Sequence, residues 1–157
     1  RNLRSLALDL RPPELDRGGL VSALDALCER HRKHTGTELR FTAAASAPEL
    51  PSASAIQAYR VFQEALANAS KHAPSHRVIA VLTPASVDGQ SGLELSLRDE
   101  ADSDRARPEP MIDPSTSSGM GLAIMRERAA LAGGRLTIES DARGYSVRLF
   151  IPCASTQ

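Results

Sequence analysis

Residues 61–73 read VFQEALANASKHA, and this stretch decides the fold. Successive residues of an α-helix lie about 100° apart around its axis, so Asn68 and Lys71 fall within about 40° of Glu64, and His72 falls about 80° away. Apolar side chains centre on the opposite side of the same helix. We therefore expect a helix with one face in a hydrophobic core and another that concentrates an acid, an amide, a cation and an imidazole.

Two interpretations of this polar face follow from the residues alone. Charged residues on the outer face of an amphipathic helix are the usual case, and the helix by itself favours a plain solvated face. The functional interpretation is a surface for metal and phosphate. A carboxylate and an amide oxygen suit Mg²⁺, whereas lysine and protonated histidine donate hydrogen bonds to phosphate oxygens. The rest of the chain decides between the two.

The composition indicates one soluble domain. A chain of 157 residues with 41% hydrophobic side chains can form a single core. Its 19 basic and 19 acidic residues give a net charge of zero, which argues against nucleic-acid binding. Cys28 and Cys153 are far apart, so we expect neither a zinc site nor a disulfide framework, and a reducing cytoplasm fits best. No apolar run approaches the roughly 18 residues of a membrane span.

Apolar periodicity and breaker residues predict the order of elements. The tail of a helix over 1–10 stops at a Pro-Pro pair. Helices are also expected over 20–32, 53–72 and 121–132, and strands over 38–42, 77–82, 93–97, 135–139 and 145–151. Residues 83–92 are expected to be a turn-rich connection and 100–118 a long loop, typical of a functional lid. Gly133-Gly134 predicts a left-handed helix end. This order predicts an α+β two-layer sandwich, a mixed sheet covered on one face by helices.

Two further stretches are ambiguous when taken alone. Residues 118–122, SGMGL, open a helix, where glycines and free N–H groups suit an anion but where a loop end that needs a turn is equally expected. Residues 97–105, LRDEADSDR, favour a solvated charged turn, although an altered nucleotide-binding box is the alternative.

Three motifs in one order remove the ambiguity. Residues 9–20, DLRPPELDRGGL, fit a D-L-R-P-P-x-L-D-x-x-G-L junction, and 63–73 fit Q-E-A-L-x-N-x-x-K-H-A position by position. Residues 119–140 reproduce nearly all of G-x-G-L-x-x-M-R-E-R-x-x-x-L-G-G-x-L-x-I-E-S. The chain thereby resembles the catalytic ATP-binding domain of two-component sensor histidine kinases, in the subclass with this junction. The resemblance implies the Bergerat-type sandwich shared with gyrase-type ATPases, with a mobile lid over ATP.

The resemblance also implies roles for individual residues. Asn68 would ligate Mg²⁺, Glu64 would be the catalytic residue that organises the metal and polar environment, and Lys71 and His72 would contact phosphates. The phosphate tail would lie against the start of the last helix, which comprises Gly119, Met120, Gly121 and Leu122.

Asp99 stands where the family's first glycine box, D-x-G-x-G, has the aspartate that accepts a hydrogen bond from the adenine amino group. The two glycine positions of that box are Ala101 and Ser103 here. If either position needs a positive φ, a side chain costs about 1 kcal/mol or more. This departure bears on nucleotide affinity more than on the fold.

The resemblance implies a domain map and partners. Residues 1–11 would end a dimerisation helix, 12–19 would be a linker, 20–152 the ATP-binding domain and 153–157 a tail. Because the chain starts in mid-pattern, we expect a fragment of a longer, homodimeric kinase, and the fragment itself can be monomeric. It would bind ATP with Mg²⁺ without autophosphorylating. The phosphoryl group would pass to a histidine on the absent dimerisation domain and then to a response-regulator aspartate. The domain would be cytoplasmic, in a parent protein that can be anchored in the inner membrane.

Two other functions remain as alternatives. The D-x-A-x-S sequence is compatible with a degenerate nucleotide-binding or non-catalytic interaction module of the same fold. A related serine kinase that binds a sigma factor is disfavoured by the R-P-P junction. His31 and His34, near a helix end, are expected to interact with the helix dipole rather than to bind a ligand, and His76 carries no motif.

Overall fold

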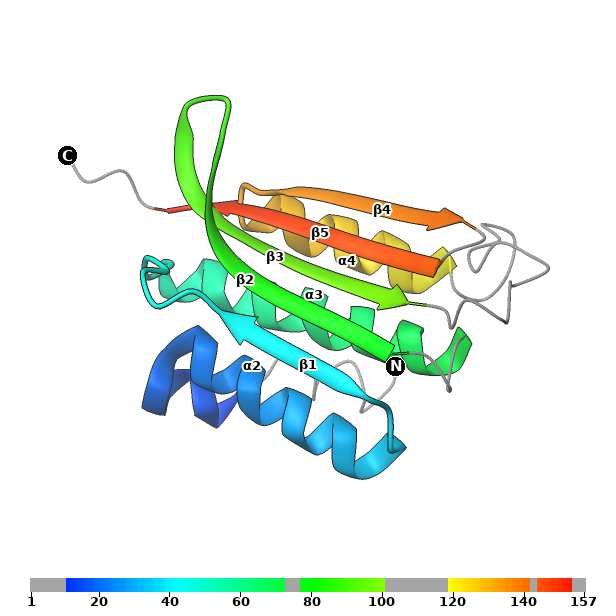
Figure 1. Ribbon diagram of the computed structural model, residues 1–157. Helices are drawn as coiled ribbons and strands as arrows, with labels where there is room; N and C mark the ends of the chain where they lie inside the picture. Colours follow the sequence, from blue (N-terminus) through cyan, green and yellow to red (C-terminus); the bar gives the residue numbers. More distant parts are fainter. Residues whose placement is uncertain (1–10, 73–76, 101–118, 142–143, 154–157) are drawn as a thin grey trace, which may run out of the picture.

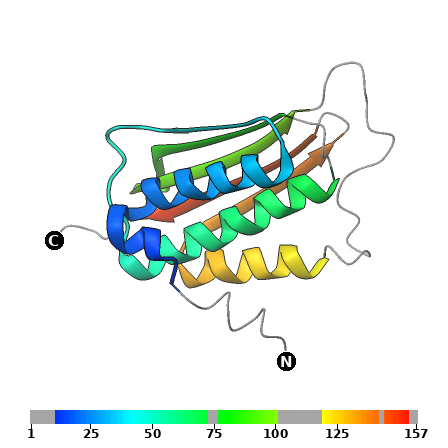
Figure 2. The same ribbon diagram turned by 90° about the horizontal axis from the view of Figure 1, so that it is seen from below.

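A mixed sheet of five strands, with helices on one of its faces, forms the described part of the chain (Figures 1 and 2). The computed structural model describes residues 11–72, 77–100, 119–141 and 144–153. The elements are α2 (Pro13–Thr35), β1 (Leu39–Ala43), α3 (Ser52–His72), β2 (Arg77–Val87), β3 (Gln90–Glu100), α4 (Gly119–Leu131), β4 (Arg135–Asp141) and β5 (Gly144–Pro152). The predicted α+β sandwich is confirmed. Residues 101–118, expected to form the lid, lie outside the described residues.

The strand order is β1-β2-β3-β5-β4, with β1 parallel to β2 and the other pairs antiparallel. Asp88 (φ 50°) and Gly89 (φ 80°) form the tight turn between β2 and β3, because a two-residue hairpin loop with positive φ matches the twist of its strands. The expectation that 83–92 is a turn-rich connection was therefore wrong: most of this segment is strand.

Gly92 explains part of that error. Its burial within β3 reflects close contact with β5, since a Cβ on Gly92 would overlap the carbonyl oxygen of Ile151 and lie 2.8 Å from the Phe150 ring. A glycine inside a strand can mark a close backbone approach as well as a turn. The sequence alone does not distinguish these two uses.

The ends of α2 and α4 are set by proline and glycine. Pro13 occupies the first helical position of α2, where its missing N–H is not needed. The helix thus begins well before the predicted residue 20, and most of the expected linker 12–19 is helical up to the break at Gly19 (φ 73°). Gly36 ends α2 with φ 68°. Gly133 (φ 67°) ends α4, and the predicted left-handed cap is confirmed.

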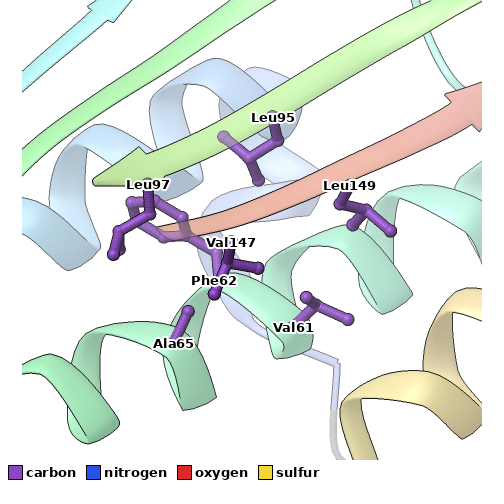
Figure 3. Close-up of a pocket in the computed structure, with 7 residues that line it drawn as sticks. All are labelled: Val61, Phe62, Ala65, Leu95, Leu97, Val147 and Leu149. Carbon is purple, nitrogen blue, oxygen red and sulfur yellow. The ribbon is translucent and has the colours of Figure 1, made fainter. Parts of the chain in front are cut away.

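The core lies between α3 and the sheet. Phe62 and Ala65 of α3 face Leu97 of β3 and Val147 of β5 around a small cavity (Figure 3). The cavity holds about 10 Å³, barely one water, and its lining is apolar, so it is a dry packing defect and not a ligand site. Among the described residues, no helix has the length and apolar character needed to cross a membrane.

Gly92→Ala is expected to destabilise the sheet, because the added Cβ would overlap the Ile151 carbonyl oxygen. Urea unfolding should give a free energy of unfolding lower by about 1–3 kcal/mol, the usual cost of overpacking. The exposed neighbour Ser91→Ala serves as control and should change this free energy by less than about 0.5 kcal/mol. Equal unfolding midpoints for the two variants would contradict the close-approach explanation.

Candidate functional site

The N-terminal turn of α4 meets the polar face of α3. A Cβ built on Gly121 would lie 2.6 Å from Oε1 of Glu64 and 3.7 Å from Nδ2 of Asn68. Asn68 is buried, with 6% of its surface exposed, and Glu64 is half-buried. A side chain at position 121 would displace the Glu64 carboxylate, which fills the space where a Cβ would lie. The structure thus brings together two motifs that are far apart in the sequence.

This arrangement has a definite electrostatic character. The first N–H groups of a helix lack partners within the helix and carry the positive end of its dipole. The first turn of α4, which starts at Gly119 and Met120, contains no acidic residue, and the Glu64 carboxylate lies beside Gly121. Backbone donors for an anion and oxygen ligands for a hard cation therefore lie side by side.

Asp99 lies in β3, where it is paired with Val78 of β2 and is only 1% exposed. The solvated-turn interpretation is wrong for residues 97–100, because they continue the strand. A carboxylate is rarely buried without a functional or structural reason. Ala101 and Ser103, the altered glycine positions, lie outside the described residues.

Tyr145 is a buried residue next to Asp99 that the sequence did not single out. Arg98 of β3 pairs with Ser146 of β5, so Asp99 and Tyr145 come one place further along the same register, and each is 1% exposed. Burial raises the pKa of the Tyr145 phenol to about 12, while the nearby Asn68 amide lowers it and Glu64 raises it. Within the described part of the chain, its hydroxyl has no hydrogen-bond partner. In the sequence, Tyr145 begins a strand that alternates with the apolar residues Val147 and Leu149. This alternation indicates a core position.

The other predicted positions are placed only in part. Lys71 and His72 form the end of α3, and their side chains lie outside what the structure describes. Leu122 is buried in α4.

Nε2 of His31 lies 2.9 Å from Oγ of Ser70. Burial, followed by the charge of His34, lowers the pKa of His31, which favours its neutral form over a charged partner of the helix dipole.

Asn68 and Glu64 could supply oxygen ligands to a hard cation such as Mg²⁺. No group of three or more histidine, cysteine, aspartate or glutamate side chains that could hold a metal occurs among the described residues. Mg²⁺ is commonly held by one or two protein oxygens together with phosphate oxygens. Asn68 and Glu64 supply oxygen donors of this kind beside the glycine cradle of α4.

Comparison with protein families places the chain in a known class of proteins. The model for the histidine kinase-, DNA gyrase B-, and HSP90-like ATPases matches residues 53–155, most of the chain, and the chain belongs to this family. Over 152 residues it is 33% identical to the sensor histidine kinase MctS of Rhizobium johnstonii, and over 154 residues 31% identical to the oxygen sensor histidine kinase NreB of Staphylococcus carnosus.

These relatives are much longer proteins. The alignments cover 97% and 96% of this chain but only 32% and 41% of the relatives. Among solved structures, the histidine kinase domain of a blue-light activated histidine kinase from Erythrobacter litoralis superimposes with a TM-score of 0.62 and 17% identity, over 90% of this chain and 69% of that one. This likeness supports the fold.

Tyr145 is expected to ionise only at strongly alkaline pH. The chain contains two tyrosines, so a Tyr59→Phe variant leaves Tyr145 as the one phenol, and its ultraviolet absorbance reports its ionisation. We expect a midpoint of about 12, against about 10 for a free phenol. The folded state holds the phenol proton of Tyr145 more tightly than the unfolded chain does. The contribution of this proton to the free energy of unfolding is therefore fully present below about pH 10 and is lost as the pH rises to about 12. A midpoint near 10 in the folded protein would contradict the burial.

Proposed function

We propose that the chain is the ATP-binding catalytic domain of a sensor histidine kinase. It would hold MgATP while the γ-phosphoryl group passes to a histidine of a dimerisation domain and then to a response-regulator aspartate. The observation that carries this proposal is the close approach of Gly121 to Glu64 and Asn68. Family membership supports ATP as the ligand, since the family is one of ATPases.

Each residue has a role in this proposal. Asn68 would bind Mg²⁺ through its amide oxygen, and Glu64 would hold the surrounding polar groups in place. Lys71 and His72 would donate to phosphate oxygens, as would the backbone N–H groups at the start of α4. When bound, Mg²⁺ neutralises phosphate charge, and catalysis of phosphoryl transfer depends chiefly on positioning and charge. The domain accordingly needs no nucleophile of its own.

Asp99 would recognise the adenine ring. A buried carboxylate is a strong acceptor and would bind the exocyclic amino group of the base. Its position in β3, beside β5 and beneath the helix layer, supports a base at the end of the sheet where α3 and α4 would carry the phosphate-binding groups.

The domain map and the cellular setting are part of the same proposal. Residues 1–11 would complete a dimerisation helix, residues 20–152 would form the catalytic domain, and the parent kinase would be a homodimer with this domain in the cytoplasm. The relatives' greater length is consistent with further domains.

A non-catalytic interaction module is the second candidate. Ala101 and Ser103 favour it, because they replace the glycines of the adenine box. Calorimetric titration of the protein with MgATP separates the two candidates. Binding supports the kinase domain, and no binding at millimolar nucleotide supports the interaction module.

Asp99→Asn is expected to weaken ADP binding at least about tenfold, because a charged acceptor is replaced by a neutral amide. Isothermal titration calorimetry with ADP measures this loss, and circular dichroism checks that the variant is folded. The exposed Asp25→Asn in α2 serves as the control and should bind as the wild type does. Unchanged affinity in folded Asp99→Asn would exclude Asp99 from adenine recognition.

Asn68→Asp is expected to change the Mg²⁺ dependence of ATP binding. The new carboxylate would add a negative charge at the proposed metal ligand, so ATP without Mg²⁺ should bind more weakly while added Mg²⁺ recovers more of the affinity. The matched control is Gln63→Glu, an amide-to-acid change on a different side of α3. Identical Mg²⁺ titrations for wild type and Asn68→Asp would contradict the metal role.

A further inference from the structure

A hydrogen bond between two side chains joins α2 to the last turn of α3. Nε2 of His31 lies 2.9 Å from Oγ of Ser70, and both residues are half-buried. A neutral imidazole has one N–H donor and one acceptor nitrogen, and a serine hydroxyl can take either role. The pair therefore makes its hydrogen bond without placing a charge between the helices.

The end of α3 is held from two sides. Figure 2 shows α3 between α2 and α4 in the helix layer. Ser70 falls about 160° from Asn68 around the helix axis, so the two side chains leave α3 on nearly opposite flanks. On the flank of Asn68, α4 approaches closely at Gly121. On the flank of Ser70, the contact comes from His31 of α2.

This hydrogen bond lies where α3 carries the groups proposed to bind phosphate. Ser70 is followed directly by Lys71 and His72, and α3 ends at His72. The last residues of a helix fray most readily, because their carbonyl groups lack partners within the helix. A hydrogen bond from a neighbouring helix limits this movement. Because hydrogen bonds weaken steeply when they are misaligned, donors in this turn depend on where its backbone is held.

We infer that His31 is a positioning residue, whose hydrogen bond with Ser70 fixes the last turn of α3 for the binding of nucleotide phosphates. Lys71 and His72 are the donors that depend on this turn. The inference rests on the proposed function, because it concerns the phosphate contacts of the nucleotide site. His31 acts through Ser70 and does not itself contact the nucleotide.

Ser70→Ala tests the inference, since it removes the hydroxyl and introduces a strong helix former. Isothermal titration calorimetry should show an ADP affinity lower by about four- to tenfold, the effect of one lost hydrogen bond. Circular dichroism checks that the variant is folded.

The matched control is Tyr59→Phe, which removes a different hydrogen bond between α2 and α3. Its hydroxyl accepts from Arg30 at 3.0 Å and belongs to a residue about 16 Å before Ser70 along α3, at about 1.5 Å per residue. This variant loses a contact between the same two helices far from the last turn of α3. Its ADP affinity should therefore change less than about twofold.

Two further variants show that His31 acts through a hydrogen bond. His31→Ala should lower ADP affinity as much as Ser70→Ala does, and the double variant should lose no more than either single variant, because both remove the same interaction. His31→Gln places an amide near the position of Nε2 and should keep ADP affinity within about twofold of the wild type.

A second cycle shows whether the effect reaches the phosphate donors. In a Lys71→Ala background, Ser70→Ala should lower ADP affinity by about twofold or less, because a donor that it positions is already gone. An equal fold loss in both backgrounds would overturn the inference and leave the proposed function standing. Unchanged ADP affinity in folded Ser70→Ala, or the same loss in Tyr59→Phe, would do likewise. Failure of the wild type to bind ADP would instead overturn the proposed function, and this inference with it.

Discussion

The close approach of α4 to α3 at Gly121 is the contact on which the candidate site depends. The Glu64 carboxylate occupies the space that any larger residue at 121 would need. A second contact lies two turns away, where Nη1 of Arg128 donates to Oε1 of Gln57 at 3.1 Å. Because Gln57 lies before Glu64 and Arg128 lies after Gly121, the helices run antiparallel. Two contacts fix both their separation and their relative position along the axis, which in turn fixes the positive end of α4 beside Glu64 and Asn68.

The sheet supplies the other half of the site by a different means. Asp99 and Tyr145 are adjacent because they continue the register in which β3 and β5 pair, and a slip of either strand by one residue would turn its side chain to the opposite face of the sheet. A buried carboxylate and a buried phenol are costly in a core that could have been apolar. Sequences break the rules of core packing chiefly at functional sites, and these two residues lie at the same end of the same strand pair.

The sequence predicted the order of the helices and strands, the core face of α3 and the glycine cap of α4, because each of these depends on local periodicity or on one residue's backbone preference. It did not predict the length of the β2–β3 hairpin. Gly89 and Gly92 are both glycines in a segment rich in turn-forming residues, yet only Gly89 lies in the turn. Gly92 lies within β3, where the close approach of β5 leaves no room for a side chain. Tyr145 was missed for a related reason. An aromatic residue in an alternating strand indicates core, and only the folded sheet shows Tyr145 as the cross-strand neighbour of Asp99.

The junction before α2 is attached to this arrangement by apolar packing more than by charge. Arg11 pairs with Asp16 at 2.5 Å, but the two side chains are 40% and 61% exposed, and such exposed pairs contribute about 0–1 kcal/mol. Leu15, between them, is only 5% exposed, and burial of a leucine contributes about 1.5–3 kcal/mol. The first turn of α2 is thus held to the domain mainly by Leu15. Beyond the break at Gly19, Arg30 donates to the Tyr59 hydroxyl at 3.0 Å and joins α2 to α3. The helix that carries Glu64 and Asn68 is therefore linked to α2 through Arg30, which also pairs with Glu14 in the first turn of α2 at 2.7 Å.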